Sequence, residues 1–447
     1  MTASPASPTP LRDLLAALYQ RTGGYSIRLG LDTTRALLAE LGVDPLALPC
    51  VHLAGTNGKG STAAMLAAIC SAAGLRTGLY TSPHLFHFSE RIRIDGIPIP
   101  DDVLSDLIDQ TLAADARQAA APDARPATFF ELATAIAFKY FLDQHVHLAI
   151  LETGMGGRLD ATNVVDPLAS VILPIGLEHT AYLGNTLAAI ATEKGGIIKP
   201  RRPVVIGAPQ APEALAVLLD LAARRQAPVL HAAEQVSIRA TPPRPATAPD
   251  AQTLHIQTPD SDLPPVRLHL PGAFQLDNAA CAITTILYLR SLGLPLPDAA
   301  IVDGLSRLRW PGRLQRLSDD PPTYLDVAHN PHAAAALAAA LRPLRRGRPL
   351  FLLCGLLTDK DAPAYFRALR PVVDRAFLVG LPPPRGTDPS ILLAAATAAG
   401  IPSEILPLGD ALPAARAAAT SAHALLLLAG SFHLPAARGH PPPKWPG

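Results

Sequence analysis

The chain has 447 residues, and at roughly 100 to 200 residues per domain this length favours two or three domains over a single small module. The 38 Lys and Arg side chains nearly balance the 37 Asp and Glu side chains, giving a formal net charge of +1. This balance excludes the strong basic field of a protein that binds nucleic acid or anionic membranes, so any phosphate binding must be local.

The composition predicts a globular protein of the cytoplasm without membrane spans. The most apolar uncharged stretch, residues 417–437, is interrupted by Ser, Thr, His, Gly and Pro, which leaves only a strand-length run at 425–428. Residues 1–10 show no secretory signal. The four cysteines lie far apart with no Cys-x-x-Cys pair, so neither a disulfide framework nor a zinc site is expected.

Short apolar runs alternate with Ala/Leu-rich helical stretches, which is the pattern of an α/β protein with a parallel sheet. In the first two thirds of the chain we predict strands at 50–54, 77–81, 147–153, 170–175 and 204–206. Helices are predicted between them at 61–73, 131–143 and 213–225. The Pro- and Thr-rich residues 239–265 predict a hairpin or an irregular surface segment.

The α/β pattern restarts after a helix that is predicted to begin near Asn278. Further strands are predicted at 323–327, 350–354, 376–379 and 425–428. Pro and Gly at 311–312 stop the preceding helix, so we place the joint at 309–312. The predicted domains are residues 1–309 and 310–447.

The strongest local signal is a glycine-rich loop between a predicted strand and a predicted helix. Glycines let backbone N–H groups surround phosphate oxygens, the helix N-terminus adds a positive dipole, and a lysine adds a point charge. Gly60 separates the lysine from the next hydroxyl, which departs from the usual spacing, and the alternative is a turn capped by Ser61. The predicted phosphate loop comprises Gly55, Thr56, Asn57, Gly58, Lys59, Gly60 and Ser61.

Polar residues follow three other predicted strands. Glu152 ends one strand and could hold Mg²⁺, although a capping or ion-pairing role is the common alternative. The glycines at 154–157 beside it predict a close approach of the backbone to something bound. Ser82 and His179 follow two other strands; taken alone, His179 would more often be a capping or core histidine.

Together these motifs resemble those of the folylpolyglutamate synthase and dihydrofolate synthase family, relatives of the Mur peptide ligases. The resemblance spans most of the chain, and its ordered motifs are the phosphate loop, Ser82–Leu85 with Glu90 and Arg91, Thr128–Glu131, Glu152–Asn163, Glu178–Thr180, Glu193–Ile197, Pro311–Arg313, Asp326–Pro331 and Asp359–Asp361. It implies a P-loop NTPase-like domain with a mostly parallel sheet, followed by a smaller Rossmann-like α/β domain.

The resemblance also implies a nucleotide and metal site between the two domains. The loop would hold ATP phosphates, with Asn278, Arg313 and Asp326 as further ATP contacts. Two Mg²⁺ sites are implied, with room for a monovalent cation, and Lys194 would be carbamylated; the alternative is a surface lysine at a helix end. The implied metal ligands are Ser82, Glu152, His179 and carbamylated Lys194.

The implied pterin or folate contacts lie in three segments. An aromatic pair suits a flat pterin, because stacking on aromatic faces adds about 1 kcal/mol beyond burial, although core packing explains at least one of the two rings equally well. The implied catalytic residues are Lys59, Glu152, His179, Lys194 and His329. The implied substrate contacts are Arg28, Leu29, Gly30, Leu31, Thr128, Phe129, Phe130, Leu159, Asp160 and Ala161.

The resemblance implies an ATP-dependent ligase, usually a monomer, that joins L-glutamate to dihydropteroate and to folates through an acyl phosphate. Val327 favours the dual-function branch, whereas Glu178, Gly195 and Phe274 depart from the residues common in the family. A single-function folylpolyglutamate synthase and a nucleotide switch or kinase remain alternatives. A cell-wall Mur ligase is disfavoured because no uridine-nucleotide domain precedes the loop.

Overall fold

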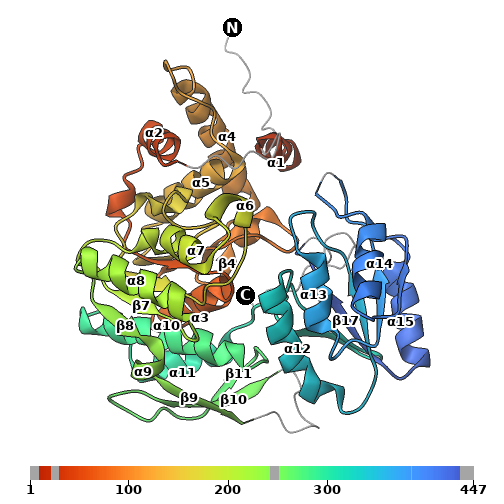
Figure 1. Ribbon diagram of the computed structural model, residues 1–447. Coiled ribbons are helices and arrows are strands. Elements are labelled where there is room, and N and C mark those ends of the chain that lie inside the picture. The colour runs from red at the N-terminus through yellow and green to blue at the C-terminus, as the bar shows by residue number, and fades with distance from the viewer. Residues whose placement is uncertain (1–9, 22–29, 242–250, 384, 433–447) are drawn as a thin grey trace.

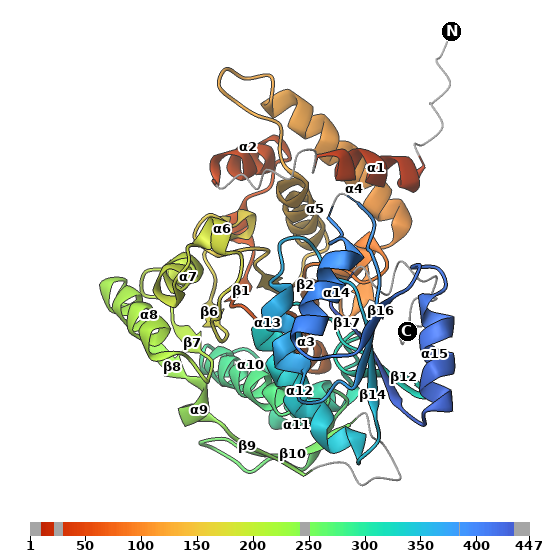
Figure 2. The same cartoon turned by 45° about the vertical axis from the view of Figure 1, so that its right-hand side comes forward.

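A computed structural model describes residues 10–21, 30–241, 251–383 and 385–432 (Figure 1). Two α/β units lie side by side, and helices α12 (Pro331–Arg345) and α13 (Ala362–Leu369) occupy the side of the second unit that faces the first (Figures 1 and 2). Within these described ranges, no helix has both the length and the apolar character needed to cross a membrane.

The first unit is built on a mostly parallel sheet with eight strands among the described residues. β1 lies between β5 and β6 and is parallel to both, whereas β3 and β4 form an antiparallel edge. The sheet order is β4 (Ile97–Pro98), β3 (Ile92–Ile94), β2 (Thr77–Tyr80), β5 (Leu148–Glu152), β1 (Cys50–Ala54), β6 (Ala169–Ile172), β7 (Val204–Ile206) and β8 (Val229–His231).

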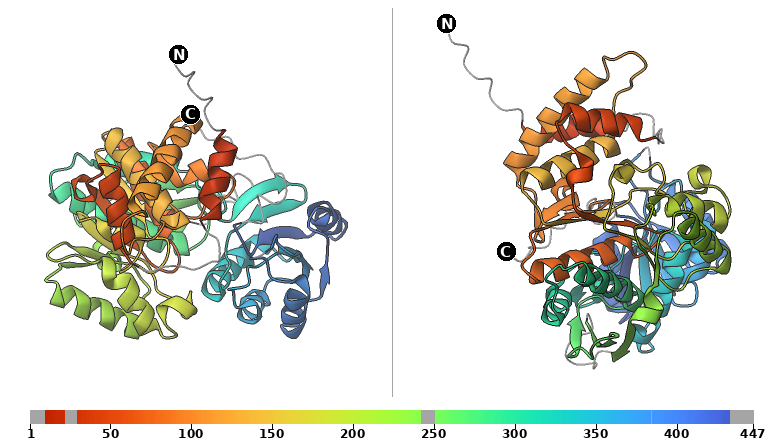
Figure 3. Two further views of the ribbon diagram at one scale, coloured as in Figure 1. Left: turned by 90° about the horizontal axis from the view of Figure 1, so that it is seen from above. Right: turned by 90° about the vertical axis from the view of Figure 1, so that its left-hand side faces the viewer.

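Helices cover both faces of this sheet (Figure 3). One face packs on α3 (Lys59–Ala72), α10 (Phe274–Ser291) and α11 (Asp298–Arg307). The other packs on α1 (Leu11–Gln20), α2 (Asp32–Glu40), α4 (Asp101–Gln118) and α5 (Phe129–Asp143). Near β6 and β7 the core is completed by α7 (Leu187–Lys194) and α8 (Pro212–Arg224). Because both faces are covered, β1 and β5 are buried at every position, as expected for apolar runs in a parallel sheet.

Short elements connect these layers. Single helical turns occur at η1 (Pro45–Ala47), η2 (Phe88–Arg91), η3 (Ala161–Val164), α6 (Thr180–Leu183), η4 (Gly195–Ile197) and α9 (Ala232–Gln235). An antiparallel sheet of β9 (Ser237–Thr241), β10 (Gln252–Gln257) and β11 (Val266–Leu268) packs against α10 and α11, with β9 and β10 at the bottom of the view in Figure 1. The predicted hairpin within 239–265 is confirmed, since β9 pairs with β10.

The second unit is a smaller sheet with helices on both faces, and its cores contain mainly Leu, Ala and Phe. The described strand order is β12 (Gln315–Asp319), β13 (Pro322–Leu325), β17 (Leu425–Ala429), β14 (Leu350–Cys354), β15 (Arg375–Leu378) and β16 (Ser403–Ile405). All pairs except β12–β13 are parallel. Besides α12 and α13, the unit contains α14 (Pro389–Ala398) and α15 (Ala411–Ser421).

The predicted α/β class with mostly parallel sheets is confirmed, but several boundaries differ. The helix predicted from Asn278 begins one turn earlier, at Phe274, because Gly272 and Ala273 lead directly into it. Six strands outside the predicted set were missed: β3, β4, β8, β11 and β16 have only two or three residues each, and β12 is a mostly polar edge strand. The proposed boundary at 309/310 falls between α11 and β12, and the domain division stays a prediction.

A nucleotide-type site between the two units

The phosphate loop follows the carboxyl end of β1 and leads into α3. Gly58 adopts a left-handed conformation with φ +90° just before the helix. The Gly55 carbonyl accepts hydrogen bonds from two lysines, Lys59 Nζ at 3.0 Å and Lys194 Nζ at 2.7 Å. The Thr56 hydroxyl and Gly176 exchange two hydrogen bonds, which fix the loop to the chain that follows β6. The loop is therefore held in shape by its own Lys59 and by contacts with Lys194 and Gly176.

Side chains from distant parts of the chain surround this loop. A Cβ placed on Gly60 would lie 3.5 Å from Glu152 Oε2 and 3.6 Å from Arg313 Nη2. One placed on Gly58 would lie 2.3 Å from Asn278 Oδ1. The structure thus brings Asn278, Glu152 and Arg313 to the loop, as predicted from the resemblance, and a side chain at either glycine would fill the space.

Glu152 and Ser82 lie together at the carboxyl ends of β5 and β2. The backbone N–H of Ser82 donates to Glu152 Oε2 at 3.1 Å, and Glu152 is almost completely buried. Burial raises the pKa of Glu152, while the positive charge of Lys59 and the Ser82 hydrogen bond act in the opposite direction. A buried carboxylate in this setting favours a bound cation.

His179 begins α6 in a left-handed conformation, with φ +50°. Burial lowers the pKa of His179 to about 4, so its imidazole is neutral near pH 7 and can act as a ligand. Its Nε2 lies 3.9 Å from Glu178 Oε1. No cluster of three or more His, Cys, Asp or Glu side chains arranged for a metal occurs in the described part of the chain. The contacts join Ser82 to Glu152, and His179 to Glu178.

Lys194 is fully enclosed at the end of α7, with 2% of its surface exposed, so the alternative of a surface lysine is wrong. Its Nζ donates to the Gly55 carbonyl. Burial, followed by repulsion from Lys59, lowers the pKa of Lys194 to about 7. A large fraction of this amine is therefore neutral and nucleophilic at neutral pH.

The second unit contributes residues from the segment after β13. Asp326 accepts hydrogen bonds from the backbone N–H groups of Leu314 and Ala328, both at 2.8 Å, so its carboxylate shapes the turn beside Arg313. His329 Nδ1 lies 2.8 Å from the Val327 carbonyl. Because a carbonyl can only accept, Nδ1 carries the proton.

Glu178, Asn330 and His332 are functional candidates that sequence reasoning missed. Glu178 Oε1 lies 3.4 Å from both His329 Nε2 and Asn330 Nδ2. Burial acts to raise the pKa of Glu178, but the His329 hydrogen bond and the charge of Lys59 outweigh it and hold the pKa well below its usual value. Glu178 and Asn330 belong to the resemblance motifs Glu178–Thr180 and Asp326–Pro331 but were given no role, and His332 directly follows the second motif.

Asn57 joins the phosphate loop to the second unit. Its Nδ2 lies 2.8 Å from His332 Nδ1, and the Asn330 amide donates to Asn57 Oδ1 at 3.0 Å. The side chain of Asn57 is therefore turned toward the neighbouring unit, and only its backbone is available as predicted for a phosphate-binding position.

The predicted substrate contacts fall into two groups. Arg28 and Leu29 lie outside the described residues, while Gly30 and Leu31 directly precede α2. At α5, the Thr128 hydroxyl and Glu131 form a reciprocal helix cap. Phe129 stacks on Tyr19 of α1 at 5.3 Å between ring centres, whereas the ring of Phe130 covers Gly154. The aromatic pair is thus divided between two environments.

The glycines that follow β5 pack closely against other parts of the same chain. A Cβ on Gly154 would lie 2.5 Å from the Phe130 ring, and one on Gly157 would lie 2.6 Å from the Lys194 carbonyl. The prediction that these glycines admit something bound is therefore corrected: tight internal packing accounts for them. Leu159 and Ala161 flank Asp160, whose carboxylate is buried and accepts from Met155 N and from Thr162.

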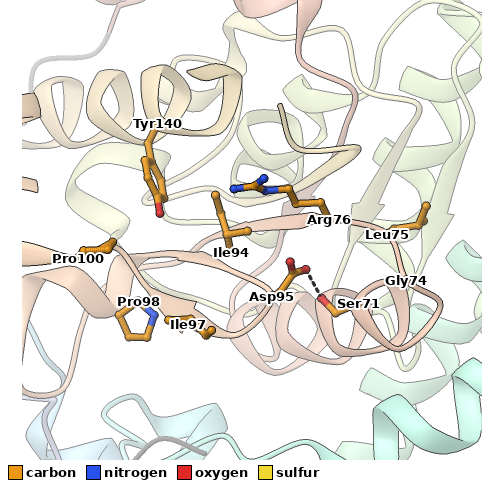
Figure 4. Close-up of a pocket in the computed structure, with 10 residues that line it drawn as sticks. All are labelled: Ser71, Gly74, Leu75, Arg76, Ile94, Asp95, Ile97, Pro98, Pro100 and Tyr140. Carbon is orange, nitrogen blue, oxygen red and sulfur yellow. Dashed lines mark hydrogen bonds between the residues drawn. The ribbon is translucent and has the colours of Figure 1, made fainter. Parts of the chain in front are cut away.

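A pocket of about 460 Å³ lies at the other end of β2 (Figure 4). Arg76 and Asp95 line it, and the Ser71 hydroxyl donates to Asp95 at 2.9 Å. Arg76 precedes the first residue of β2, whereas Ser82 follows its last, so this pocket lies away from the phosphate loop. Ligands of open parallel sheets bind at the carboxyl ends of strands, and the pocket is therefore separate from the candidate site.

Comparison with known proteins agrees with this geometry. Residues 53–286 match the Mur ligase middle domain, and residues 312–432 match the Mur ligase glutamate ligase domain. The chain is 34% identical to the Escherichia coli dihydrofolate synthase/folylpolyglutamate synthase over 96% of its own length and 95% of that protein. The chain belongs to this family. The Bacillus subtilis member is 37% identical over 75% of this chain and 77% of its own.

Solved structures of the family superpose over almost the whole chain. Mycobacterium tuberculosis folylpolyglutamate synthase complexed with ADP gives a TM-score of 0.87 at 33% identity, covering 96% of this chain and 97% of that one. Escherichia coli FolC in complex with DHPP and ADP gives 0.81 at 31% identity, with 96% coverage of each chain. Family membership removes the nucleotide switch and the kinase as alternatives.

Proposed function

We propose that this protein is an ATP-dependent ligase that adds L-glutamate to dihydropteroate and to the γ-carboxylate of folates. The observation that supports this best is the convergence of Lys59, Glu152, Lys194 and Arg313 on one phosphate loop, in a chain similar to the Escherichia coli enzyme along nearly its full length. Nucleotide and DHPP are bound by relatives of this fold.

The reaction requires an activated acid, because a carboxylate has a poor leaving group and repels nucleophiles. Transfer of the terminal phosphoryl group of ATP to the carboxylate would give an acyl phosphate, which the glutamate amine attacks with release of phosphate. Lys59 and the loop N–H groups are placed to stabilise charge on the transferred phosphoryl. Holding three substrates between two units could supply about 7 to 11 kcal/mol through positioning.

The buried donors fit a hard cation. Ser82, Glu152 and His179 would hold Mg²⁺, and Lys194 as a carbamate would add an anionic oxygen ligand; bound Mg²⁺ supplies neutralisation of phosphate charge. The deeply buried Glu152 and the neutral His179 support this assignment. His329 is placed by Glu178 and the Val327 carbonyl to orient an incoming group.

The dual activity is tested by measuring ADP release with glutamate and each acceptor in turn: dihydropteroate, tetrahydrofolate and a cell-wall precursor. We expect release with the first two acceptors only. Oxygen-18 placed in the dihydropteroate carboxylate should appear in the released phosphate. Activity with tetrahydrofolate alone would assign the protein to the single-function enzymes, and unlabelled phosphate would exclude the acyl phosphate.

A further inference from the structure

Arg91, the last residue of η2, is a buried arginine whose guanidinium forms no ion pair within the described residues. It is 7% exposed, and its Nε donates to His84 Nδ1 at 2.8 Å. Its guanidinium carbon lies 5.2 Å from the centre of the Phe129 ring and 5.8 Å from that of Phe88. Among the residues that the structure describes, Arg91 forms no ion pair with a carboxylate, and the only side-chain hydrogen bond of its guanidinium is the one to His84.

The two carboxylates that interact electrostatically with Arg91, those of Glu90 and Glu152, already accept hydrogen bonds from other groups. Glu90 accepts three hydrogen bonds from the backbone N–H groups of residues 85–87, at 2.9, 3.0 and 2.9 Å. Glu152 accepts from Ser82 and faces the phosphate loop beside Arg313. A buried charge without a partner is costly, so such groups ordinarily meet an opposite charge from another source.

The position of Arg91 indicates what that source is. The guanidinium contacts His84, two residues beyond Ser82, and Phe129, one residue before the ring that covers Gly154. It therefore packs directly on Phe129 of the proposed aromatic wall and lies within electrostatic reach of the proposed metal ligand Glu152. With Nε fixed by His84 and the plane supported by rings, its terminal N–H groups keep a defined direction, which suits bidentate binding of a carboxylate.

We propose that Arg91 binds a substrate carboxylate during ligation, an assignment that rests on the proposed function. Two substrates carry this chemistry: the pterin-linked acid and the incoming amino acid. A guanidinium fork would hold either acid at two oxygens, and the flanking rings would exclude water from the pair.

The test compares Arg91→Met and Arg91→Lys with Arg224→Met, a control at an exposed arginine of α8. For each protein, KM is measured separately for dihydropteroate and for L-glutamate, and ADP affinity is measured by calorimetry. We expect Arg91→Met to raise one of the two KM values at least tenfold while ADP affinity stays within twofold. Arg91→Lys, which keeps the charge but loses the fork, should raise the same KM less.

The KM that rises identifies the source of the carboxylate. If both KM values stay within twofold in Arg91→Met, the proposal is overturned; should that variant fail to fold, unchanged KM values in Arg91→Lys overturn it equally. If the wild type releases no ADP with both substrates, the proposed reaction is wrong. Calorimetric binding of each acid in the presence of ADP to the wild type and Arg91→Met then decides the role of Arg91 by itself.

Discussion

At the scale of single residues, the first unit buries a histidine that the proposed reaction does not use. His52 on β1 is fully enclosed, and its Nε2 lies 2.7 Å from the Thr162 hydroxyl, which in turn donates to Asp160 at 2.6 Å. Since that hydroxyl proton goes to Asp160, His52 Nε2 is the donor in the first contact. The histidine therefore helps to fix the loop that follows Glu152.

Acid should destabilise the protein through His52. Burial lowers its pKa to about 3, below the value of about 6.5 in an unfolded chain. Between these pH values the unfolded chain binds the additional proton, so the free energy of unfolding falls as the pH falls, by about 2 kcal/mol between pH 6.5 and pH 5. Urea unfolding at pH 7 and pH 5 should show a smaller pH effect in His52→Gln than in the wild type.

The control for this experiment is His145→Gln at an exposed histidine, which should keep the pH effect of the wild type. Equal pH effects in the wild type and His52→Gln would show that His52 is not the group responsible. The comparison uses differences between pH values, so the contacts that glutamine loses at pH 7 do not enter it.

Carbamylation of Lys194 is the second prediction at this scale. The reaction with carbon dioxide requires the neutral amine, and a pKa of about 7 makes that form abundant at pH 8 and scarce at pH 6. Carbon-13 NMR with labelled bicarbonate should therefore show a carbamate signal at pH 8 that is weaker at pH 6. The signal should vanish in Lys194→Met and persist in Lys199→Met. A signal that survives in Lys194→Met would place the modification elsewhere.

Among single residues, the sequence could predict those with distinctive chemistry. The phosphate loop and Glu152 were found from their residue types and their places at strand ends, whereas Lys194 was found only from the family resemblance; the structure brings all three together. Glu178, Asn330 and Arg91 were not assigned a role, because glutamate, asparagine and arginine are common on surfaces. Only their burial and their partners, contributed by residues up to 273 positions away, distinguish them.

At the scale of elements, the turn between β1 and α3 depends on Gly55. It has φ +154°, and a Cβ there would lie 2.6 Å from Leu173 Cβ on the chain after β6. We expect Gly55→Ala to lower the free energy of unfolding by about 1 to 3 kcal/mol and to weaken ADP binding at least tenfold. The loss of binding would follow because the Gly55 carbonyl holds both Lys59 and Lys194.

Gly409→Ala is the matched control, since nothing lies within 4 Å of the position that its Cβ would take. Its unfolding free energy should change by less than about 0.5 kcal/mol, and ADP binding should not change. Thermal melting and calorimetry measure both quantities. Wild-type ADP affinity in Gly55→Ala would show that the loop tolerates displacement from β6.

Strands that form continuous apolar runs were predicted from the sequence, whereas the short strands at the edge of the sheet were not. β1 and β14 were placed at their observed bounds because each is a continuous apolar run. The β3–β4 edge was missed although Asp95 and Gly96, at φ +51° and +81°, form the Asp-Gly dipeptide that is typical of a tight hairpin. Contacts elsewhere in the chain add to this local signal, since the Asp95 carboxylate accepts from Thr77 N and Ser71.

At the scale of the whole molecule, the two units meet where the phosphate loop contacts the start of α12. The side-chain amides of Asn57 and Asn330 form hydrogen bonds across this contact between the units, which we call the seam. Asn57 also contacts His332, and Asn330 also contacts Glu178. Arg93 of β3 also stacks on Trp310, near the joint, at 5.1 Å from the ring centre. These contacts couple the placement of the second unit to the shape of the loop that would hold the nucleotide.

A double-mutant cycle on Asn57→Ala and Asn330→Ser tests this coupling. Serine keeps the cap that Asn330 provides to Ala333 of α12 but is too short to reach Asn57. We expect each single variant to lower kcat about tenfold while ADP affinity changes less than threefold, because positioning of the second unit is lost and nucleotide contacts are not. The double variant should be little worse than either single one, with a coupling of about 1 kcal/mol. The control is Asp388→Ser, which exchanges one N-cap residue for another at α14 and should leave kcat unchanged. Strictly additive losses in the cycle would mean that the two amides act independently. The contact between the units would then not transmit the position of the second unit to the loop.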